Sequence, residues 1–230
     1  MLRIALILLI LALGGCIGSG KKPIEVQFQG SPDASEMLVF LPGLGNNAKH
    51  FFKNGFHETA ARGTRYSESA FLSANVHLGY YRTGALPERF EQDVLAVYPD
   101  RKRTLVGISM GGMGVAALGR LFPDEVDEVV LIAPFLGKGK LMERFRSGAL
   151  EVRPEDSKKD GFLLENWAWL ISDQTDVKIN LLFGEEDRLS ESHRLLLEQA
   201  PHICVIRIPG KHRWSTWIPL WESFQESSCP

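Results

Sequence analysis

The sequence lacks a strong charge imbalance, a long apolar run, internal repeats and low-complexity segments. Its 26 basic and 28 acidic residues give a formal net charge of only −2, whereas a nucleic-acid-binding protein needs a strongly basic face. The apolar run at residues 4–13 is shorter than the roughly 20 residues that a membrane-spanning helix requires. These absences argue against a nucleic-acid partner and a spanning helix. The length suits one α/β domain with a full core, although length alone would also allow two domains.

The N-terminal residues resemble an export signal. Arg3 precedes the apolar run, and the string Leu13-Gly14-Gly15-Cys16 follows it. This string resembles the lipobox of bacterial lipoproteins, in which the cysteine is lipidated and becomes the mature N-terminus. The resemblance implies a signal peptide over residues 1–15, a lipidated tether over residues 16–23 and a membrane anchor on Cys16. An ordinary secretory signal with an incidental cysteine is the alternative.

The same N-terminal resemblance carries an expectation about localisation. Ile17 follows the cysteine, where an aspartate would have favoured retention in the inner membrane. We therefore expect a bacterial cell-envelope protein, lipid-anchored in the outer membrane and facing the periplasm. An oxidising periplasm would permit a disulfide between Cys204 and Cys229, and two unpaired thiols are an equal alternative.

Apolar strands and amphipathic helices alternate along residues 24–230. Strands are expected at residues 24–29, 37–41, 76–80, 104–108, 126–133, 177–183 and 203–208, and helices at residues 86–98, 110–122, 161–171 and 189–199. The first strand alternates polar and apolar residues, as an edge strand does. The alternation of helices and strands predicts a mostly parallel sheet covered on both faces.

One connection is far longer than a crossover between neighbouring strands requires. Residues 135–174 separate two expected strands, and the part at about 137–160 is charged and contains glycine. Long loops in compact domains are usually functional or disordered. This part is therefore interpreted as either a small lid or a disordered loop.

A nucleophile motif lies between an expected strand and an expected helix. The string Gly107-Ile108-Ser109-Met110-Gly111 follows the apolar pair Leu105-Val106. In a G-x-S-x-G elbow, a strained turn holds the serine Oγ clear of the sheet, and the glycines let two backbones approach closely. The pattern also arises by chance, so its value depends on an acid and a base elsewhere.

The chain offers an acid and a base after two later strands. Asp187 follows the expected strand at residues 177–183, and His212 lies in a glycine-led loop after the last strand. A serine nucleophile needs a base to accept its proton and a carboxylate to orient that base. The order Ser109, Asp187, His212 is that of an α/β-hydrolase. Glu185 and Glu186 are the rival acids.

The other histidines are expected to be structural. His77 lies inside the expected strand at residues 76–80, which predicts a packed core residue. His193 lies on a late helix, which predicts a surface or capping position. Neither is expected to take part in catalysis.

The oxyanion of an acyl-transfer reaction needs backbone donors beside the nucleophile. One expected donor is the N–H of Met110, the residue after Ser109. The other is Leu44, in the glycine-rich loop Pro42-Gly43-Leu44-Gly45-Asn46 after the strand at residues 37–41. A plain glycine turn is the alternative interpretation of that loop.

Taken in order, the elbow, the acid, the histidine and the glycine-rich loop resemble the α/β-hydrolase superfamily from about residue 24 to residue 224. The resemblance implies an α/β-hydrolase fold with a mostly parallel sheet of about eight strands, flanked by helices, over residues 24–230 with a small lid insertion. It also implies a Ser-His-Asp triad that transfers acyl groups to water. Pro42-Gly43 stands where the family commonly has His-Gly.

These features together predict a serine hydrolase of the cell envelope that cleaves small or medium acyl esters or thioesters without a metal or other cofactor. A catalytically silent binding or assembly lipoprotein on the same scaffold and a serine peptidase are the alternatives. The oligomeric state is not indicated. The residues considered for a substrate pocket are Tyr80, Tyr81, Arg82, Trp167, Trp169 and Trp214.

Overall fold

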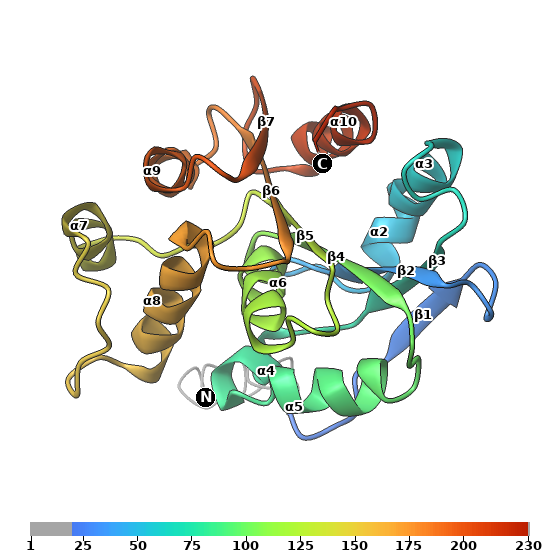
Figure 1. The fold of residues 1–230 in the computed structure, drawn as a ribbon, viewed down its shortest axis with the longest axis horizontal. Coiled ribbons are helices and arrows are strands. Elements are labelled where there is room, and N and C mark those ends of the chain that lie inside the picture. The colour runs from blue at the N-terminus through green and yellow to red at the C-terminus, as the bar shows by residue number, and fades with distance from the viewer. Residues whose placement is uncertain (1–19, 230) are drawn as a thin grey trace, which may run out of the picture.

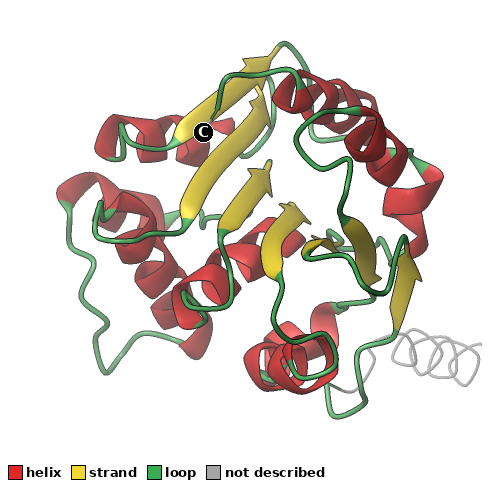
Figure 2. Cartoon of the chain, turned by 45° about the vertical axis from the view of Figure 1, so that its right-hand side comes forward, coloured by secondary structure: helices red, strands yellow, loops and turns green. Residues whose placement is uncertain are grey.

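Strand β2 (Glu36–Leu41) shows how the sequence builds a layered domain. Met37 and Val39 face one hydrophobic core, whereas Leu38 and Phe40 face a second core on the other side of the sheet. Because successive side chains of a strand point to opposite faces, an uninterrupted apolar run requires cover on both sides. Figure 2 shows this arrangement, with the strands as a middle layer between two layers of helices.

The computed structural model describes residues 20–229. These residues form a sheet of seven strands in the order β1-β3-β2-β4-β5-β6-β7, in which only β1 runs antiparallel to its neighbour. Besides β2, the strands are β1 (Val26–Gln29), β3 (Ala70–Ala74), β4 (Lys102–Ile108), β5 (Glu128–Ile132), β6 (Lys178–Gly184) and β7 (Cys204–Ile208). The predicted α/β class with a mostly parallel sheet is confirmed, with seven described strands where about eight were expected.

Helices cover both faces of this sheet (Figure 1). One face carries α4 (Leu78–Thr83), α5 (Leu86–Phe90), the π-helix η2 (Glu91–Leu95), α6 (Met110–Leu121), α7 (Lys140–Ser147), α8 (Lys158–Ile171) and α9 (Ser190–Gln199). The other face carries α2 (Lys49–Lys53), α3 (Phe56–Arg62) and α10 (Trp214–Gln225). The second core is rich in aromatic rings. Phe40 stacks on Phe51 with ring centroids 4.8 Å apart, and Phe56 stacks on Trp221 with ring centroids 5.4 Å apart. Full burial of one such side chain contributes about 1.5–3 kcal/mol.

The predicted strand at residues 76–80 is wrong. The strand lies earlier, at β3, whose residues are all buried between β1 and β2. Residues 78–83 form α4 instead, because the His77 side chain accepts a hydrogen bond from the N–H of Gly79 (3.1 Å) and caps the helix. His77 is therefore a half-buried cap and not the core histidine that was expected.

The charged segment at about residues 137–160 contains a helix, α7, that packs against α8 and α9. Phe145 of α7 is fully buried and stacks on Trp167 of α8, with ring centroids 4.0 Å apart. Arg144 forms an ion pair with Asp156 at 2.6 Å. The segment is therefore tied to neighbouring helices by both apolar and charged contacts.

The strand order reverses between β2 and β4. The chain passes from β2 to β3 on one side, and then returns to β4 on the other side of β2. Loops that leave the carboxyl ends of two strands at such a switch point diverge and open a crevice, where α/β proteins bind ligands. The loop at residues 42–46 and the serine elbow follow β2 and β4 and lie at this crevice.

Two expectations concern the ends of the chain. The predicted signal peptide and residues 16–19 of the tether, which include Cys16, lie outside the described residues. Within residues 20–229, no helix combines the length and the apolar character needed to cross a membrane. Near the other end, Cys204 of β7 and Cys229 form a disulfide, which selects one of the two alternatives that the sequence left open.

Candidate active site

A serine, an aspartate and a histidine lie at one edge of the sheet, each just after the carboxyl end of a parallel strand. Ser109 follows β4, Asp187 follows β6 and His212 follows β7. The Ser109 Oγ lies 2.9 Å from His212 Nε2, and His212 Nδ1 lies 2.7 Å from Asp187 Oδ2. A carboxylate can only accept, so Nδ1–H donates to Asp187, and the unprotonated Nε2 accepts from the serine hydroxyl. The structure thus brings the three predicted residues into one hydrogen-bonded line.

The turn that holds Ser109 is strained. Its backbone has φ +56° and ψ −112°. Such a conformation costs a residue with a Cβ about 1–3 kcal/mol and persists only where the surroundings enforce it. Here the Ser109 N–H donates to the Ile132 carbonyl (2.9 Å), and the Ser109 carbonyl accepts from the N–H groups of Met113 (3.2 Å) and Phe135 (2.9 Å). These bonds from β5, α6 and the loop after β5 hold the serine in its unusual conformation.

The two glycines of the elbow have no room for a side chain. A Cβ on Gly107 would lie 2.4 Å from the Gly111 carbonyl oxygen, and one on Gly111 would lie 2.0 Å from the Leu41 carbonyl oxygen. Both obstacles are backbone atoms, which cannot rotate away. The glycine spacing in the motif therefore has the direct steric cause that the sequence predicts.

The Asp187 side chain is fixed in one orientation. Its side chain is buried, with its Oδ1 accepting the N–H of Leu189 (2.8 Å) while its Oδ2 faces His212. Both carboxylate oxygens therefore have donors, which fixes the rotamer. The rival acids Glu185 and Glu186 are exposed, and Glu185 lies 3.7 Å from Arg207 instead.

The loop expected to supply an oxyanion donor lies against the elbow. A Cβ on Gly43 would come within 3.1 Å of the Ile108 carbonyl oxygen and 3.3 Å of the Ser109 Cβ. The next residue, Leu44, lines the same pocket as Ser109 and Met110. Met110 is the first residue of α6, where N–H groups have no acceptor within the helix and the helix dipole favours negative charge. Both predicted donor residues thus lie beside the serine.

His193 is a contributor that sequence reasoning missed, since the expected surface position is wrong. It is fully buried, and its Nε2–H donates to the Pro134 carbonyl (2.8 Å), directly before Phe135, whose N–H holds Ser109. Burial lowers the pKa of His193 to about 4, so the ring is neutral. Only the packing of α9 beneath the elbow places this ring, and no local sequence signal marks it.

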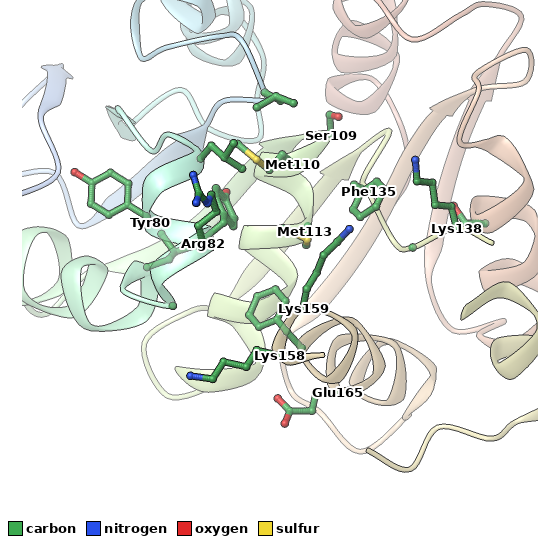
Figure 3. Close-up of a pocket in the computed structure, with 18 of the residues that line it drawn as sticks. Tyr80, Arg82, Ser109, Met110, Met113, Phe135, Lys138, Lys158, Lys159 and Glu165 are labelled. Atoms are coloured by element: carbon green, nitrogen blue, oxygen red, sulfur yellow. The ribbon is translucent and has the colours of Figure 1, made fainter. Parts of the chain in front are cut away.

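A pocket of about 1130 Å³ opens from Ser109 along α6. Met110 and Met113 of α6 lie on its floor, with α4 on one side and α8 on the other (Figure 3). Leu86 of α5 and Phe162 of α8 add further apolar surface. The volume and the apolar lining suit a small organic substrate.

The residues considered for this pocket divide into two groups. Tyr80, Tyr81 and Arg82 of α4 line it. The three tryptophans are absent from its lining: Trp167 is buried against Phe145, and Trp214 donates to the Asn46 side chain. Sequence reasoning therefore identified one wall, and the opposite wall on α8 emerged only from the tertiary structure.

Metal ligands were not expected in the sequence. Among residues 20–229, no three His, Cys, Asp or Glu side chains gather into a group that could hold a metal ion. The chemistry that the described side chains offer is a serine hydroxyl with a base, an orienting carboxylate and backbone donors, which is the equipment of acyl transfer.

Comparison with solved structures shows the same fold at low sequence identity. The thioesterase domain from the curacin biosynthetic pathway has a TM-score of 0.59 and 14% identity, covering 90% of this chain and 100% of that domain. Est1E from Butyrivibrio proteoclasticus has a TM-score of 0.63 and 16% identity, covering 88% of this chain and 92% of its own. An S-formylglutathione hydrolase from Staphylococcus aureus has a TM-score of 0.60 and 15% identity, covering 91% of this chain and 98% of its own.

At the level of sequence, no curated protein matches this chain. The family described as alpha/beta hydrolase fold does match, over residues 36–201. This range includes β2, the serine elbow and Asp187, and ends before His212. The match covers most of the sequence and agrees with the sheet order and the strained serine turn. The chain therefore belongs to the alpha/beta hydrolase fold family.

Proposed function

We propose that this protein is a serine hydrolase that cleaves carboxylic esters or thioesters with Ser109, His212 and Asp187. The observation that carries the proposal is the hydrogen-bonded line from Asp187 through His212 to Ser109, which ends at a large, mostly apolar pocket. A scaffold that only binds partners has no use for a strained serine turn with a base 2.9 Å from its hydroxyl.

The geometry supports a two-step mechanism. His212 Nε2 accepts the hydroxyl proton as Ser109 Oγ attacks the substrate carbonyl, and the ester or thioester bond breaks as His212 returns that proton to the leaving group. Water then attacks the acyl-serine by the same route, which releases the acid and restores the hydroxyl. Asp187 holds the Nδ1–H tautomer throughout, and the N–H groups of Leu44 and Met110 stabilise the oxyanion in both steps.

The proposal includes a place in the cell. The N-terminal string ending in Cys16 supports a lipid-anchored protein of the bacterial envelope that faces the periplasm. The disulfide between Cys204 and Cys229 agrees with an oxidising compartment. A lipid on Cys16 would place the domain next to a membrane.

The test is labelling with a fluorophosphonate probe, followed by peptide mapping and an assay with 4-nitrophenyl esters. We expect one adduct per chain on Ser109, and its loss in Ser109→Ala and His212→Ala. Ester hydrolysis should fall at least about 10⁴-fold in Ser109→Ala, because the three residues act as a unit. Ser215→Ala, at an exposed serine on α10, is the matched control and should keep full activity and labelling.

Two outcomes contradict the proposal. Activity of Ser109→Ala within about tenfold of the parent would assign the chemistry to another group. A folded protein without any adduct would favour the silent binding scaffold, and the search would then turn to a partner in the envelope.

A further inference from the structure

Positive charge is concentrated around the pocket, although the chain as a whole is slightly acidic. The pocket lining contains six basic residues and two acidic ones, whereas the full sequence has 26 basic and 28 acidic residues. A cleft lined with one sign of charge concentrates the field and attracts ions of the opposite sign. The imbalance is therefore a property of this pocket and not of the whole surface.

The two acidic residues do not neutralise this excess. Glu165 already pairs with Arg120 at 2.8 Å, and Glu191 pairs with Arg146 outside the pocket. Five basic side chains of the lining form no ion pair with any residue between 20 and 229, namely Arg82, Lys138, Lys158, Lys159 and Arg188. Like charges brought together without counter-ions repel each other, and a bound anion relieves that repulsion.

The unpaired cations come from separate parts of the chain and surround the apolar floor. Figure 3 shows Arg82 of α4 on one side of Met110 and Met113, with Lys159 of α8 and Lys138 on the other side. Lys159 also lies 5.3 Å from the centroid of the Phe135 ring. Because Phe135 donates its N–H to the Ser109 carbonyl, this cation is tied to the segment that holds the nucleophile.

The floor itself is uncharged and elongated. Met110, Met113 and Leu121 line the pocket from the first to the last residue of α6, a length of about 17 Å at 1.5 Å per residue. The far end holds the paired Arg120 and Glu165, and Figure 3 shows Lys158 near Glu165 as well. The apolar floor suits an acyl chain, and the cations that lie nearer Ser109 than Lys158 does suit a charged group close to the reacting bond.

We propose that the substrate is an acyl ester or thioester whose alcohol or thiol part carries a carboxylate or phosphate group. The acyl chain lies along α6, and Arg82, Lys138, Lys159 and Arg188 attract the charged leaving group. This inference rests on the proposed serine hydrolase function and names the substrate class of the same site.

The test compares three esters that share an eight-carbon acyl part and a nitrophenol chromophore. In 4-nitro-3-(octanoyloxy)benzoate the leaving group is anionic, in 2-nitrophenyl octanoate the ester is neutral, and in mono-2-nitrophenyl suberate the anion is at the far end of the acyl chain. We expect kcat/KM for the benzoate to exceed that for the neutral ester by about tenfold at low salt. Raising the ionic strength to about 0.5 M should remove most of that preference.

Charge-reversal variants connect the preference to the pocket. The ratio of the two kcat/KM values, benzoate over neutral ester, should fall about tenfold or more in Lys138→Glu with Lys159→Glu. The matched control is Lys102→Glu with Lys178→Glu, which makes the same change in net charge at the amino ends of β4 and β6, away from Ser109. The control should leave the ratio unchanged. A general effect of net charge would change this ratio equally in both double variants, and that result would overturn the assignment to the pocket.

The remaining outcomes separate this inference from the function on which it rests. Hydrolysis of the neutral ester without any preference for the benzoate overturns the inference and leaves the proposed function intact. A preference for the suberate places the anion on the acyl side and overturns the proposed orientation. Hydrolysis of none of the three contradicts the proposed function and this inference together.

Two further substrates then distinguish a soluble source of the anion from a lipid one. Octanoyl-coenzyme A carries phosphate on a soluble thiol, and dioctanoyl phosphatidylglycerol carries it on a lipid headgroup. The faster of the two identifies the source, and cleavage of neither overturns phosphate as the charged group.

Discussion

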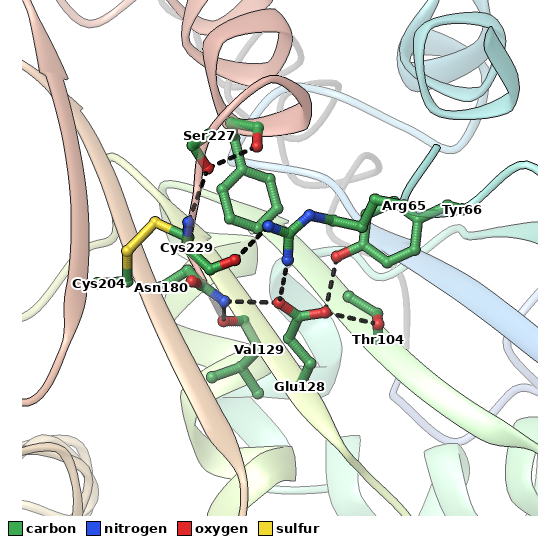
Figure 4. A network of polar contacts seen from close by, with 10 residues as sticks. Arg65, Tyr66, Thr104, Glu128, Val129, Asn180, Cys204, Ser227 and Cys229 are labelled. Atoms are coloured by element: carbon green, nitrogen blue, oxygen red, sulfur yellow. Dashed lines mark hydrogen bonds and ion pairs between the residues drawn. A yellow bond between two sulfur atoms is a disulfide. The ribbon is translucent and has the colours of Figure 1, made fainter. Parts of the chain in front are cut away.

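The two ends of the sheet each contain a buried carboxylate with several hydrogen-bond donors, but only one of these two networks leads to a nucleophile and a pocket. At the carboxyl end, Asp187 faces His212, which in turn faces Ser109 and the pocket. At the opposite end, Glu128 accepts from Tyr66 (2.7 Å), Thr104 (3.1 Å) and Asn180 (2.8 Å), and Arg65 lies 3.6 Å away (Figure 4).

The donors around Glu128 are structural side chains, and none of them is a nucleophile beside a pocket. Tyr66 is buried, and that burial together with the Glu128 charge raises the pKa of its hydroxyl, so it stays a donor. Arg65 also donates to the carbonyl of Cys229, whose disulfide joins the chain end to β7 (Figure 4). The comparison teaches that a buried, satisfied carboxylate is no sign of catalysis by itself. What distinguishes the Asp187 end is a nucleophile with access to an open pocket.

The largest expected difference between the two ends is in turnover. Asp187→Asn should lower kcat for ester hydrolysis about 10⁴-fold, because an amide at this position no longer selects the His212 tautomer that can accept the serine proton. Glu128→Gln should keep kcat within about threefold and lower the free energy of unfolding by about 2–3 kcal/mol, since it weakens a buried network. Steady-state kinetics and urea denaturation measure the two effects.

Equal losses of kcat in Asp187→Asn and Glu128→Gln would break this comparison. That result would mean that the far network supports catalysis through the sheet. A stable Asp187→Asn protein that remains active would instead remove Asp187 from the mechanism.

A smaller effect is expected from the disulfide, and only on stability. The sequence separation of 25 residues between Cys204 and Cys229 corresponds to about 3–4 kcal/mol of chain entropy removed from the unfolded state. Replacing both cysteines with serine should lower the free energy of unfolding by that order while kcat at 25 °C stays the same. Reductant should destabilise the parent protein in the same way and leave the double variant unaffected. A fall in kcat would connect this end of the sheet to the active site.

The last effect concerns His193, a structural group at the active-site end itself, and appears only as the pH falls. Because burial lowers its folded-state pKa from 6.5 to about 4, the unfolded chain binds more protons between these two values. The free energy of unfolding should therefore fall as the pH drops from 6.5 to 4, by roughly 3 kcal/mol at 1.36 kcal/mol per pKa unit.

The matching variant is His193→Gln, whose side-chain amide retains a donor for the Pro134 carbonyl and does not titrate. Its stability should depend less on pH in this range than that of the parent protein or of His202→Gln, a control at an exposed position. Denaturation midpoints measured from pH 7 to pH 4 give the difference. Parallel curves for all three proteins would show that His193 does not titrate on unfolding.

Much of the fold was predictable because its signals are local. The apolar runs of β2, β4, β5, β6 and β7 correspond to the expected strands, and the alternating run at residues 24–29 marked an edge strand. The error at residues 76–80 arose where two apolar stretches adjoin and only the first pairs with β1 and β2. A histidine cap, visible only in three dimensions, assigns the second stretch to a helix.

The candidate site was predictable in its residue types and not in its surroundings. The elbow identified Ser109, and the order of strands placed Asp187 and His212 at the same edge of a parallel sheet. The basic side chains around the pocket were not foreseen, because Arg82, Lys138, Lys159 and Arg188 belong to four separate segments. Similarly, His193 had the sequence context of a surface residue and is instead packed beneath the elbow.

Features that depend on neighbours along the chain could be read from the sequence. It specified the strand–turn–helix of the elbow, since glycine is required where two backbones approach within contact distance, and it specified the order of the strands that carry Asp187 and His212. The tertiary structure alone decided which cysteines pair, which histidine is buried and neutral, and which cations surround the pocket. These features depend on contacts between residues far apart in sequence, and such contacts exist only once the sheet and its two layers of helices have assembled.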